Sequence, residues 1–168
     1  MLKIVGTIII LISSGIYGFI LSGEINLRYK ELLEIKKAFF LLKSEIEYNV
    51  CPIREALCNV SSRCARKFGI IFQNIAESNE KNFYCAWEKE LKKGFSGLHL
   101  SKNDEDELLM LKDSFGLSDR MSQINQIDLY LLRLETSINS LAEIMPQKMK
   151  MYKCLSIGIG IMISLVII

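Results

Sequence analysis

The sequence predicts an all-α protein, a six-helix bundle flanked by a transmembrane helix at each end. Three observations lead to this prediction. Apolar residues recur every three or four positions, residues 4–23 and 154–168 carry no charge, and no segment of convincing length alternates as a strand does. The predicted domains are an N-terminal transmembrane helix over 4–23, a helical bundle over 24–153 and a C-terminal transmembrane helix over 154–168.

The first element is a run of uncharged residues over 4–23, between Lys3 and Glu24. A helix of this length can cross a hydrocarbon core of about 30 Å. A secretory signal peptide is the alternative interpretation. Its apolar region is usually only about 7 to 15 residues long, and no A-x-A-like cleavage site precedes Glu24. We therefore expect a retained anchor.

An amphipathic helix is expected to continue this anchor without a break from Ile25. Its apolar residues follow one another at intervals of three and four positions, at Leu32, Ile35, Phe39, Leu42 and Ile46. Pro52 should end the helix, because proline disfavours the helical conformation at the preceding residue and fits the first turn of a new helix.

Three shorter helices are expected next. The second helix begins at Ile53 and should end near Gly69, which can act as a C-terminal cap. A short third helix is expected over 70–77. A serine and an asparagine at 78–79 can cap the fourth helix, which Gly94 should end.

A loop over 95–102 holds the single histidine, His99. Asn103 can cap the fifth helix, and four consecutive carboxylates at 104–107 then oppose the positive end of the helix dipole. An acidic metal site is the alternative, but the alternating oxygen ligands and turn glycine of a calcium loop are missing. Gly116 should break this helix.

The sixth helix is expected to start at a cap, Ser118, and to run into the second anchor. Its apolar seam comprises Ile124, Ile127, Leu131, Leu134, Ile138, Leu141 and Met145. Pro146 predicts a kink, because proline removes a backbone donor inside a helix. The uncharged stretch 154–168 would rise only about 22 Å as a helix, so it must thin the bilayer, include residues 149–152 in the span, or stop partway across the membrane.

The composition excludes several classes of function. The chain has 21 Lys and Arg against 19 Asp and Glu, a balance that argues against nucleic-acid binding. The five cysteines form no CxxC pair and, with one histidine, offer no zinc spacing, so we expect free, mostly buried thiols in a reducing compartment. Carboxylate pairs such as Glu45 with Glu47 are predicted to be solvated surface.

No pattern of catalytic residues is evident either. The sequence shows no nucleophile motif near His99 and no glycine-rich phosphate loop. We expect no catalytic residue, no metal and no cofactor, and therefore a binding or assembly protein, not an enzyme.

Three segments resemble the stage III sporulation protein AB family. Residues 41–48 with 52–57 (LLKSEIEY and PIREAL) resemble its first helical hairpin. Residues 115–123 (FGLSDRMSQ) resemble its LG-x-x-D-x-x-x-Q element, and 150–155 (KMYKCL) resemble the entry to its C-terminal anchor. The three matches keep their order and span nearly the whole chain.

This resemblance implies a membrane protein of the mother cell during endospore formation, with its bundle facing the cytoplasm. The family is similar to the F-type platform protein of type II secretion systems. The implied partners are the stage III AA ATPase and other proteins of the channel between mother cell and forespore, and a homo-oligomer is possible. The resemblance marks Asp119, Gln123, Glu45 and Tyr48 as a candidate partner interface.

A different class of protein is also compatible with two anchors around a helical bundle. An extracytoplasmic ligand-binding sensor is built in this way. Such a receptor would need an output segment after its second membrane helix, and its bundle cysteines would risk oxidation outside the cell. We therefore favour the assembly platform with an inward-facing bundle, which the positive charges at Lys148, Lys150 and Lys153 also indicate.

Overall fold

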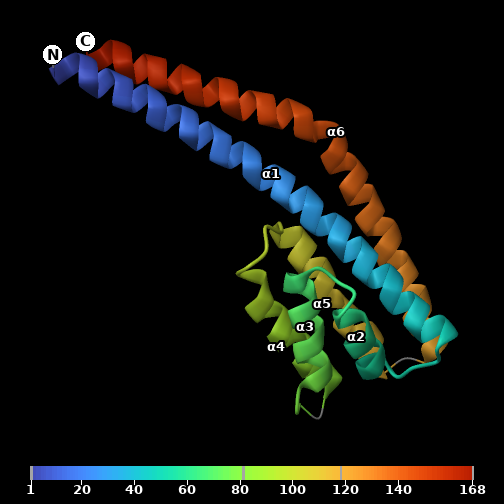
Figure 1. Ribbon diagram of the computed structural model, residues 1–168. Helices are drawn as coiled ribbons and strands as arrows, with labels where there is room; N and C mark the ends of the chain where they lie inside the picture. The colour runs from blue at the N-terminus through green and yellow to red at the C-terminus, as the bar shows by residue number, and fades with distance from the viewer. Residues whose placement is uncertain (1, 81, 118, 168) are drawn as a thin grey trace. The chain divides into compact units, whose positions relative to one another are not determined.

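The computed structural model describes residues 2–80, 82–117 and 119–167, and the side chains of these residues except 2–5, 7–11, 114, 116, 117, 153 and 164–167. The described residues form helices and no strand, which confirms the all-α class (Figure 1). The helices are α1 (Leu2–Tyr48), α2 (Ile53–Ser61), α3 (Arg66–Glu77), α4 (Phe83–Phe95), α5 (Lys102–Leu117) and α6 (Arg120–Ile167).

The chain divides into two compact units. Met1–Tyr29 and Ser140–Ile168 make up one, called here the hairpin unit. Lys30–Asn139 make up the other, the bundle unit. The two long helices α1 and α6 each contribute to both units, so the predicted continuation of the first segment into the bundle without a break is confirmed.

The core of the bundle unit contains the apolar seams expected from the sequence. Leu32, Ile35, Phe39, Leu42 and Ile46 of α1 are all 0–1% exposed. On α6, Ile124, Ile127, Leu134 and Ile138 are buried as well. The three-and-four spacing predicted these positions correctly, because it places them on the one face of each helix that other helices cover.

Trp87 of α4 lies at the centre of an aromatic cluster. Its ring centroid lies 5.1 Å from that of Phe115, 5.8 Å from Phe83, 6.3 Å from Phe72 and 6.4 Å from Phe39. Its indole Nε1 donates a hydrogen bond of 2.9 Å to the carbonyl of Leu108 in α5. This cluster joins α1, α3, α4 and α5, so the four helices share one core.

Two predicted boundaries between α2 and α4 are wrong. The second helix ends at Ser61, and Gly69 lies inside α3, which begins at Arg66. A Cβ atom on Gly69 would lie only 2.4 Å from the backbone oxygen of Ser61. Gly69 is therefore required for close contact between α2 and α3, and it does not cap a helix.

The helix caps also differ from the predicted ones. Asn82, not residue 78 or 79, caps α4, and its side chain accepts a 3.0 Å hydrogen bond from the Tyr84 backbone. At the start of α5, Ser101 and Asp104 bond reciprocally, with Ser101 N to Asp104 Oδ2 at 2.9 Å and Asp104 N to Ser101 Oγ at 3.3 Å. α5 includes Gly116 and extends to Leu117, while the predicted cap at 118 lies outside the described residues.

Small residues bring α1 and α6 together within the hairpin unit. The hydroxyl of Ser14 donates to the carbonyl of Ser156. A Cβ atom on Gly18 would lie 2.5 Å from Ser156 Oγ, so a larger side chain does not fit there. Ser22 is 1% exposed and Ser156 is 8% exposed. The contact surface of this pair is thus narrow and built from serine and glycine.

Large apolar side chains cover the outer face of the same unit. On both helices these side chains are about half exposed or more, at Ile12, Ile16, Tyr17, Phe19, Ile20, Leu155, Ile157, Ile159, Ile161 and Met162. Within the described part of the chain, however, no helix combines the length and apolar character needed to cross a membrane. The predicted transmembrane helices 4–23 and 154–168 are not supported by this result, and both fall partly on residues whose side chains are not described.

The prediction of mostly buried cysteines is wrong. Cys58, Cys85 and Cys154 are exposed, while Cys51 and Cys64 are partly buried. All five are free thiols. Burial raises the pKa of the Cys64 thiol to about 11, so this thiol is protonated and unreactive at neutral pH.

Candidate partner interface

The structure brings the four predicted interface residues to one end of the bundle unit. Glu45 and Tyr48 lie in the last turn of α1, and Asp119 and Gln123 lie at the start of α6. The guanidinium of Arg120 donates to the backbone carbonyl of Glu47, which ties the start of α6 to the end of α1. The side chains of the four residues nevertheless have different surroundings.

Glu45 is buried, with 5% of its surface exposed, so the prediction that it is solvated is wrong. Its carboxylate accepts hydrogen bonds from Asn49 at 2.7 Å and Asn59 at 3.4 Å, and it pairs with Arg63 at 3.0 Å. These partners lie directly after α1, in α2 and in the turn after α2. Glu45 therefore joins α1 to α2 inside the molecule and does not offer a surface to a partner.

The environment of Glu45 makes its contribution to stability depend on pH. Hydrogen bonds from Asn49 and Asn59 and the charge of Arg63 hold the pKa of Glu45 below its ordinary value of 4.5. A lowered pKa in the folded state means that the stabilisation is present above pH 4.5 and is lost as the pH falls below it.

Glu45→Gln is therefore expected to lower the free energy of unfolding at neutral pH. The loss should be only about 1–2 kcal/mol, because Arg63, the charged partner of Glu45, is itself largely exposed. The difference from the wild type should shrink below pH 4.5. Thermal unfolding followed by circular dichroism between pH 7 and pH 3 measures both effects. A difference that stayed constant with pH would contradict the ionised state of Glu45.

Three exposed apolar side chains surround this end of the bundle unit, and we call them the end surface: Tyr48, Val50 and Met121. They are 76%, 61% and 61% exposed. Val50 has a φ of 55°, in the left-handed region that β-branched residues rarely adopt. Val50 lies in the short connection between α1 and α2.

Asp119 and Gln123 organise the first turn of α6. The hydroxyl and backbone of Ser122 donate to the Asp119 carboxylate, and these hydrogen bonds lower the pKa of Asp119. The side-chain amide of Gln123 donates to the Phe115 carbonyl at 3.5 Å, and thus links α6 to the end of α5. Both contacts agree with the role in helix initiation that their position indicates.

One residue of the motif at 52–57 has a structural role that the sequence pattern did not reveal. The guanidinium of Arg54 donates to four backbone carbonyls at the end of α3 and just beyond, those of Ile75, Ala76, Ser78 and Glu80, at 2.8–3.4 Å. It also lies over the Phe83 ring, 5.7 Å from the centroid. Arg54 therefore holds the connection between α3 and α4, using acceptors 21 to 26 residues away.

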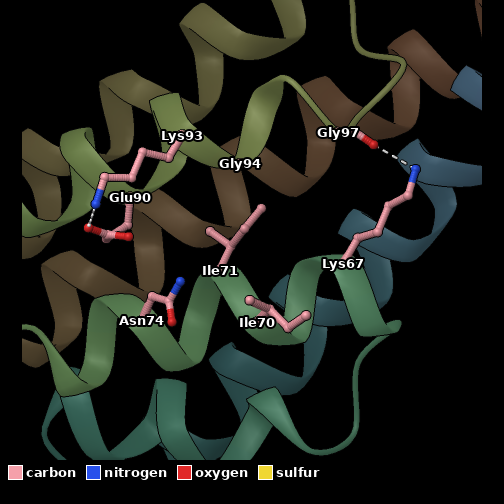
Figure 2. A pocket seen from close by; sticks show the side chains of 8 residues that line it. All are labelled: Lys67, Ile70, Ile71, Asn74, Glu90, Lys93, Gly94 and Gly97. Carbon is pink, nitrogen blue, oxygen red and sulfur yellow. Dashed lines mark hydrogen bonds and ion pairs between the residues drawn. The ribbon is translucent and has the colours of Figure 1, made fainter.

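A pocket of about 300 Å³ lies between α3 and α4 (Figure 2). Ile71 reaches toward Gly94, where a Cβ atom would lie 2.3 Å from Ile71 Cδ1. The two lysines at its rim are engaged within the chain: Lys93 pairs with Glu90 at 2.6 Å, and Lys67 donates to the Gly97 carbonyl at 2.6 Å. Because these charges are already neutralised or hydrogen-bonded, the pocket offers little to an anionic ligand.

Acidic residues at the start of α5 do not gather around a common point. Across the described residues, no group of three or more His, Cys, Asp or Glu side chains is placed to hold a metal ion. Asp104 is the most buried of the four carboxylates at 104–107, and it accepts a hydrogen bond from the Ser101 hydroxyl at the helix start. The alternative of an acidic metal site thus receives no support from these residues.

These features define a class of protein: a chain whose described residues form helices in two units, a bundle unit and a hairpin unit, each of which includes parts of the two long helices α1 and α6. The family model described as stage III sporulation protein AB matches residues 3–168, so the chain belongs to that family. The resemblance seen in the three sequence segments is thereby confirmed.

Two similar proteins agree with this assignment. Stage III sporulation protein AB of Bacillus subtilis (strain 168) is 26% identical over 170 residues, which cover 99% of each chain. A solved structure titled stage III sporulation protein AB matches with a TM-score of 0.64 and 25% identity, and covers 71% of this chain and 96% of that one.

Proposed function

We propose that this stage III sporulation protein is a membrane-anchored platform that docks a secretion-type ATPase through the end surface of its bundle unit. The observation that carries the proposal is the end surface itself, where Tyr48, Val50 and Met121 are exposed around a strained backbone. Tyrosine and methionine are enriched at the centres of protein interfaces. The activity proposed is binding and assembly, without a cofactor and without catalysis.

The proposed partners are the stage III AA ATPase and other proteins of the channel between mother cell and forespore. Membership of the stage III sporulation protein AB family supports this context. The similarity of that family to secretion platform proteins supports the choice of an ATPase as the docked partner.

The hairpin unit is the proposed membrane anchor. Its buried contact surface holds small residues such as Ser14 and Gly18, whereas its outer face exposes large ones such as Phe19 (71%) and Met162 (69%). In the bundle unit the distribution is reversed, because large apolar side chains are buried in its core. Lipid chains would cover such an outer face, and helices in lipid commonly pack through serine and glycine.

The proposed orientation places the bundle unit in the mother-cell cytoplasm. Cys58 and Cys85 are exposed on this unit and can serve as natural probes once Cys154 is replaced by serine. A membrane-impermeant maleimide should label them in lysed but not in intact cells. Labelling in intact cells would place the bundle on the opposite side, and recovery of the chain in the soluble fraction would refute the anchor.

Tyr48→Ala is expected to weaken binding of the stage III AA ATPase to the full-length protein by about tenfold, as truncation of an interface aromatic commonly does. Binding can be measured by pull-down over a range of ATPase concentrations. The matched control is Ile70→Ala, which removes a half-exposed apolar side chain from α3 and should leave binding unchanged.

Stability measurements separate docking from folding in this experiment. Neither Tyr48→Ala nor Ile70→Ala should change thermal unfolding appreciably, because both side chains are exposed. Gln123→Ala should lower stability, because it removes the link from α6 to the Phe115 carbonyl. Equal ATPase binding by the wild type and Tyr48→Ala would refute docking at the end surface.

A further inference from the structure

A second surface of the bundle unit forms a groove between α1 and α6. The groove has a volume of about 450 Å³ and is lined by Leu33, Lys36, Lys37, Phe40, Leu131 and Glu135. Phe40 is 66% exposed and Leu33 is 40% exposed. Lone exposed apolar residues are ordinary, but a phenylalanine and two leucines along one groove form a surface suited to an apolar side chain of a partner.

The groove carries a net positive charge. Lys36 Nζ lies 2.8 Å from Glu135 Oε1, so these two charges largely neutralise each other across the groove. Lys37 adds a further positive charge and is exposed. Lys37 lies on the same face of α1 as Leu33 and Phe40, because positions three, four and seven apart share a helical face. An occupant of this groove should therefore be apolar at its centre and acidic beside it.

The exposed face of α5 has this chemistry. Asp106, Met110 and Asp113 are all exposed, and Met110 is 63% exposed. Their spacing of four and three residues places them on one face of α5. Asp106 and Asp113 lie about 10 Å apart along the helix, the same rise that separates Leu33 from Phe40 on α1.

The charge of α5 as a whole agrees with this match. Between Lys102 and Leu117 the helix holds five Asp and Glu residues against two lysines, which gives a net charge of −3. Asp104, one of the five, is buried at the helix start, so the exposed excess lies farther along the helix.

The α5 helix cannot fill the groove of its own chain. Leu108, Leu111 and Phe115 bury the opposite face of α5 in the core, and the Leu108 carbonyl accepts the hydrogen bond from Trp87. The groove and the Asp106–Met110–Asp113 face are therefore two fixed surfaces of one unit, with complementary charge and matching length.

We propose that the groove between α1 and α6 of one copy binds the α5 face of a second copy of this chain. Met110 of one copy inserts between Leu33 and Phe40 of the other. Asp106 and Asp113, on either side of Met110, lie against the positive charge of Lys37. Because the two surfaces differ, the contact is heterologous and repeats from copy to copy as a ring or an open chain. The end surface remains free, so this inference goes beyond the proposed ATPase docking and does not depend on it.

The test uses the full-length protein in a mild detergent, with its mass measured by sedimentation velocity over a range of concentrations. The wild type should form species larger than a monomer. Lys37→Glu should weaken self-association at least about tenfold, because it places like charges opposite each other. The control Lys92→Glu makes the same charge change at an exposed position on α4 and should have no effect.

Charge exchange makes the test specific to this pair of surfaces. A chain with Asp106→Lys and Asp113→Lys should also fail to self-associate. Mixed with the Lys37→Glu chain, it should form alternating assemblies larger than a dimer, because the unchanged groove of one variant accepts the unchanged α5 face of the other, and the two surfaces with reversed charge also match. Combining all three substitutions in one chain should restore longer assembly.

Three results would overturn the proposal: a wild type that is monomeric at every concentration, equal association of Lys37→Glu and Lys92→Glu, or a mixture of the Lys37→Glu chain with the Asp106→Lys and Asp113→Lys chain that stays monomeric. Circular dichroism of each variant confirms that it is folded. Tyr48→Ala should associate as the wild type does, and a defect in ATPase binding alone would leave the self-association intact.

Discussion

Trp87→Ala is expected to lower the free energy of unfolding by about 3–5 kcal/mol, the range found when a buried aromatic residue is cut to alanine in a core. Trp87 is 0% exposed, and four other aromatic rings lie within 6.4 Å of it, centroid to centroid. The substitution also removes the hydrogen bond from Nε1 to the Leu108 carbonyl. Since α1, α3, α4 and α5 meet at this side chain, the resulting cavity would loosen the whole bundle unit.

Urea unfolding followed by circular dichroism at 222 nm measures this loss, because the variant lacks the single tryptophan of the chain as a fluorescence probe. Trp87→Phe is the matched control. It keeps most of the ring contacts and loses mainly the hydrogen bond, so we expect a loss of only about 1–2 kcal/mol. Equal losses for the two variants would show that ring packing at this site contributes little.

Gly69→Ala is expected to destabilise the bundle unit by about 1–3 kcal/mol, the usual effect of overpacking. The added Cβ would lie 2.4 Å from the Ser61 backbone oxygen. Backbone at the end of α2 cannot rotate away as a flexible side chain can, so α2 and α3 must move apart. In an exposed helix the same change would be stabilising, because alanine favours helix formation over glycine.

Gly97→Ala is the matched control for this prediction. A Cβ atom at Gly97 would lie 3.6 Å from the Gly94 oxygen, an ordinary contact, and no described glycine has a positive φ. The control should therefore be neutral or stabilising by a few tenths of a kcal/mol. Urea unfolding should therefore show a loss of stability for Gly69→Ala and no loss for Gly97→Ala. A neutral Gly69→Ala would mean that the close contact of α2 with α3 is not required.

Much of the fold could be predicted from local patterns. The three-and-four spacing of apolar residues identified the buried faces of α1 and α6, and Pro52 correctly predicted the end of α1 and the start of α2 at Ile53. These predictions succeeded because a helix has a fixed period and proline has a fixed φ, both properties of the neighbouring residues alone.

The residues of the candidate interface have surroundings that the sequence did not predict. The resemblance did not distinguish Glu45, which is buried, from Tyr48, which is exposed. Both residues lie outside the apolar seam of α1. Only the approach of Asn59 and Arg63 from the α2 side encloses the Glu45 carboxylate.

The sequence by itself thus determined the helical class, the buried seams and the family. The tertiary structure decided what Gly69, Glu45 and Arg54 do, because each acts on a group that is distant in sequence or on another helix. A glycine can cap a helix or permit a close contact between two helices, and a glutamate can be solvated or take part in a buried hydrogen-bond network. Which role a residue takes depends on the backbone or side chain that packs against it from another part of the chain. The spacing of residues along one helix does not show which group that is.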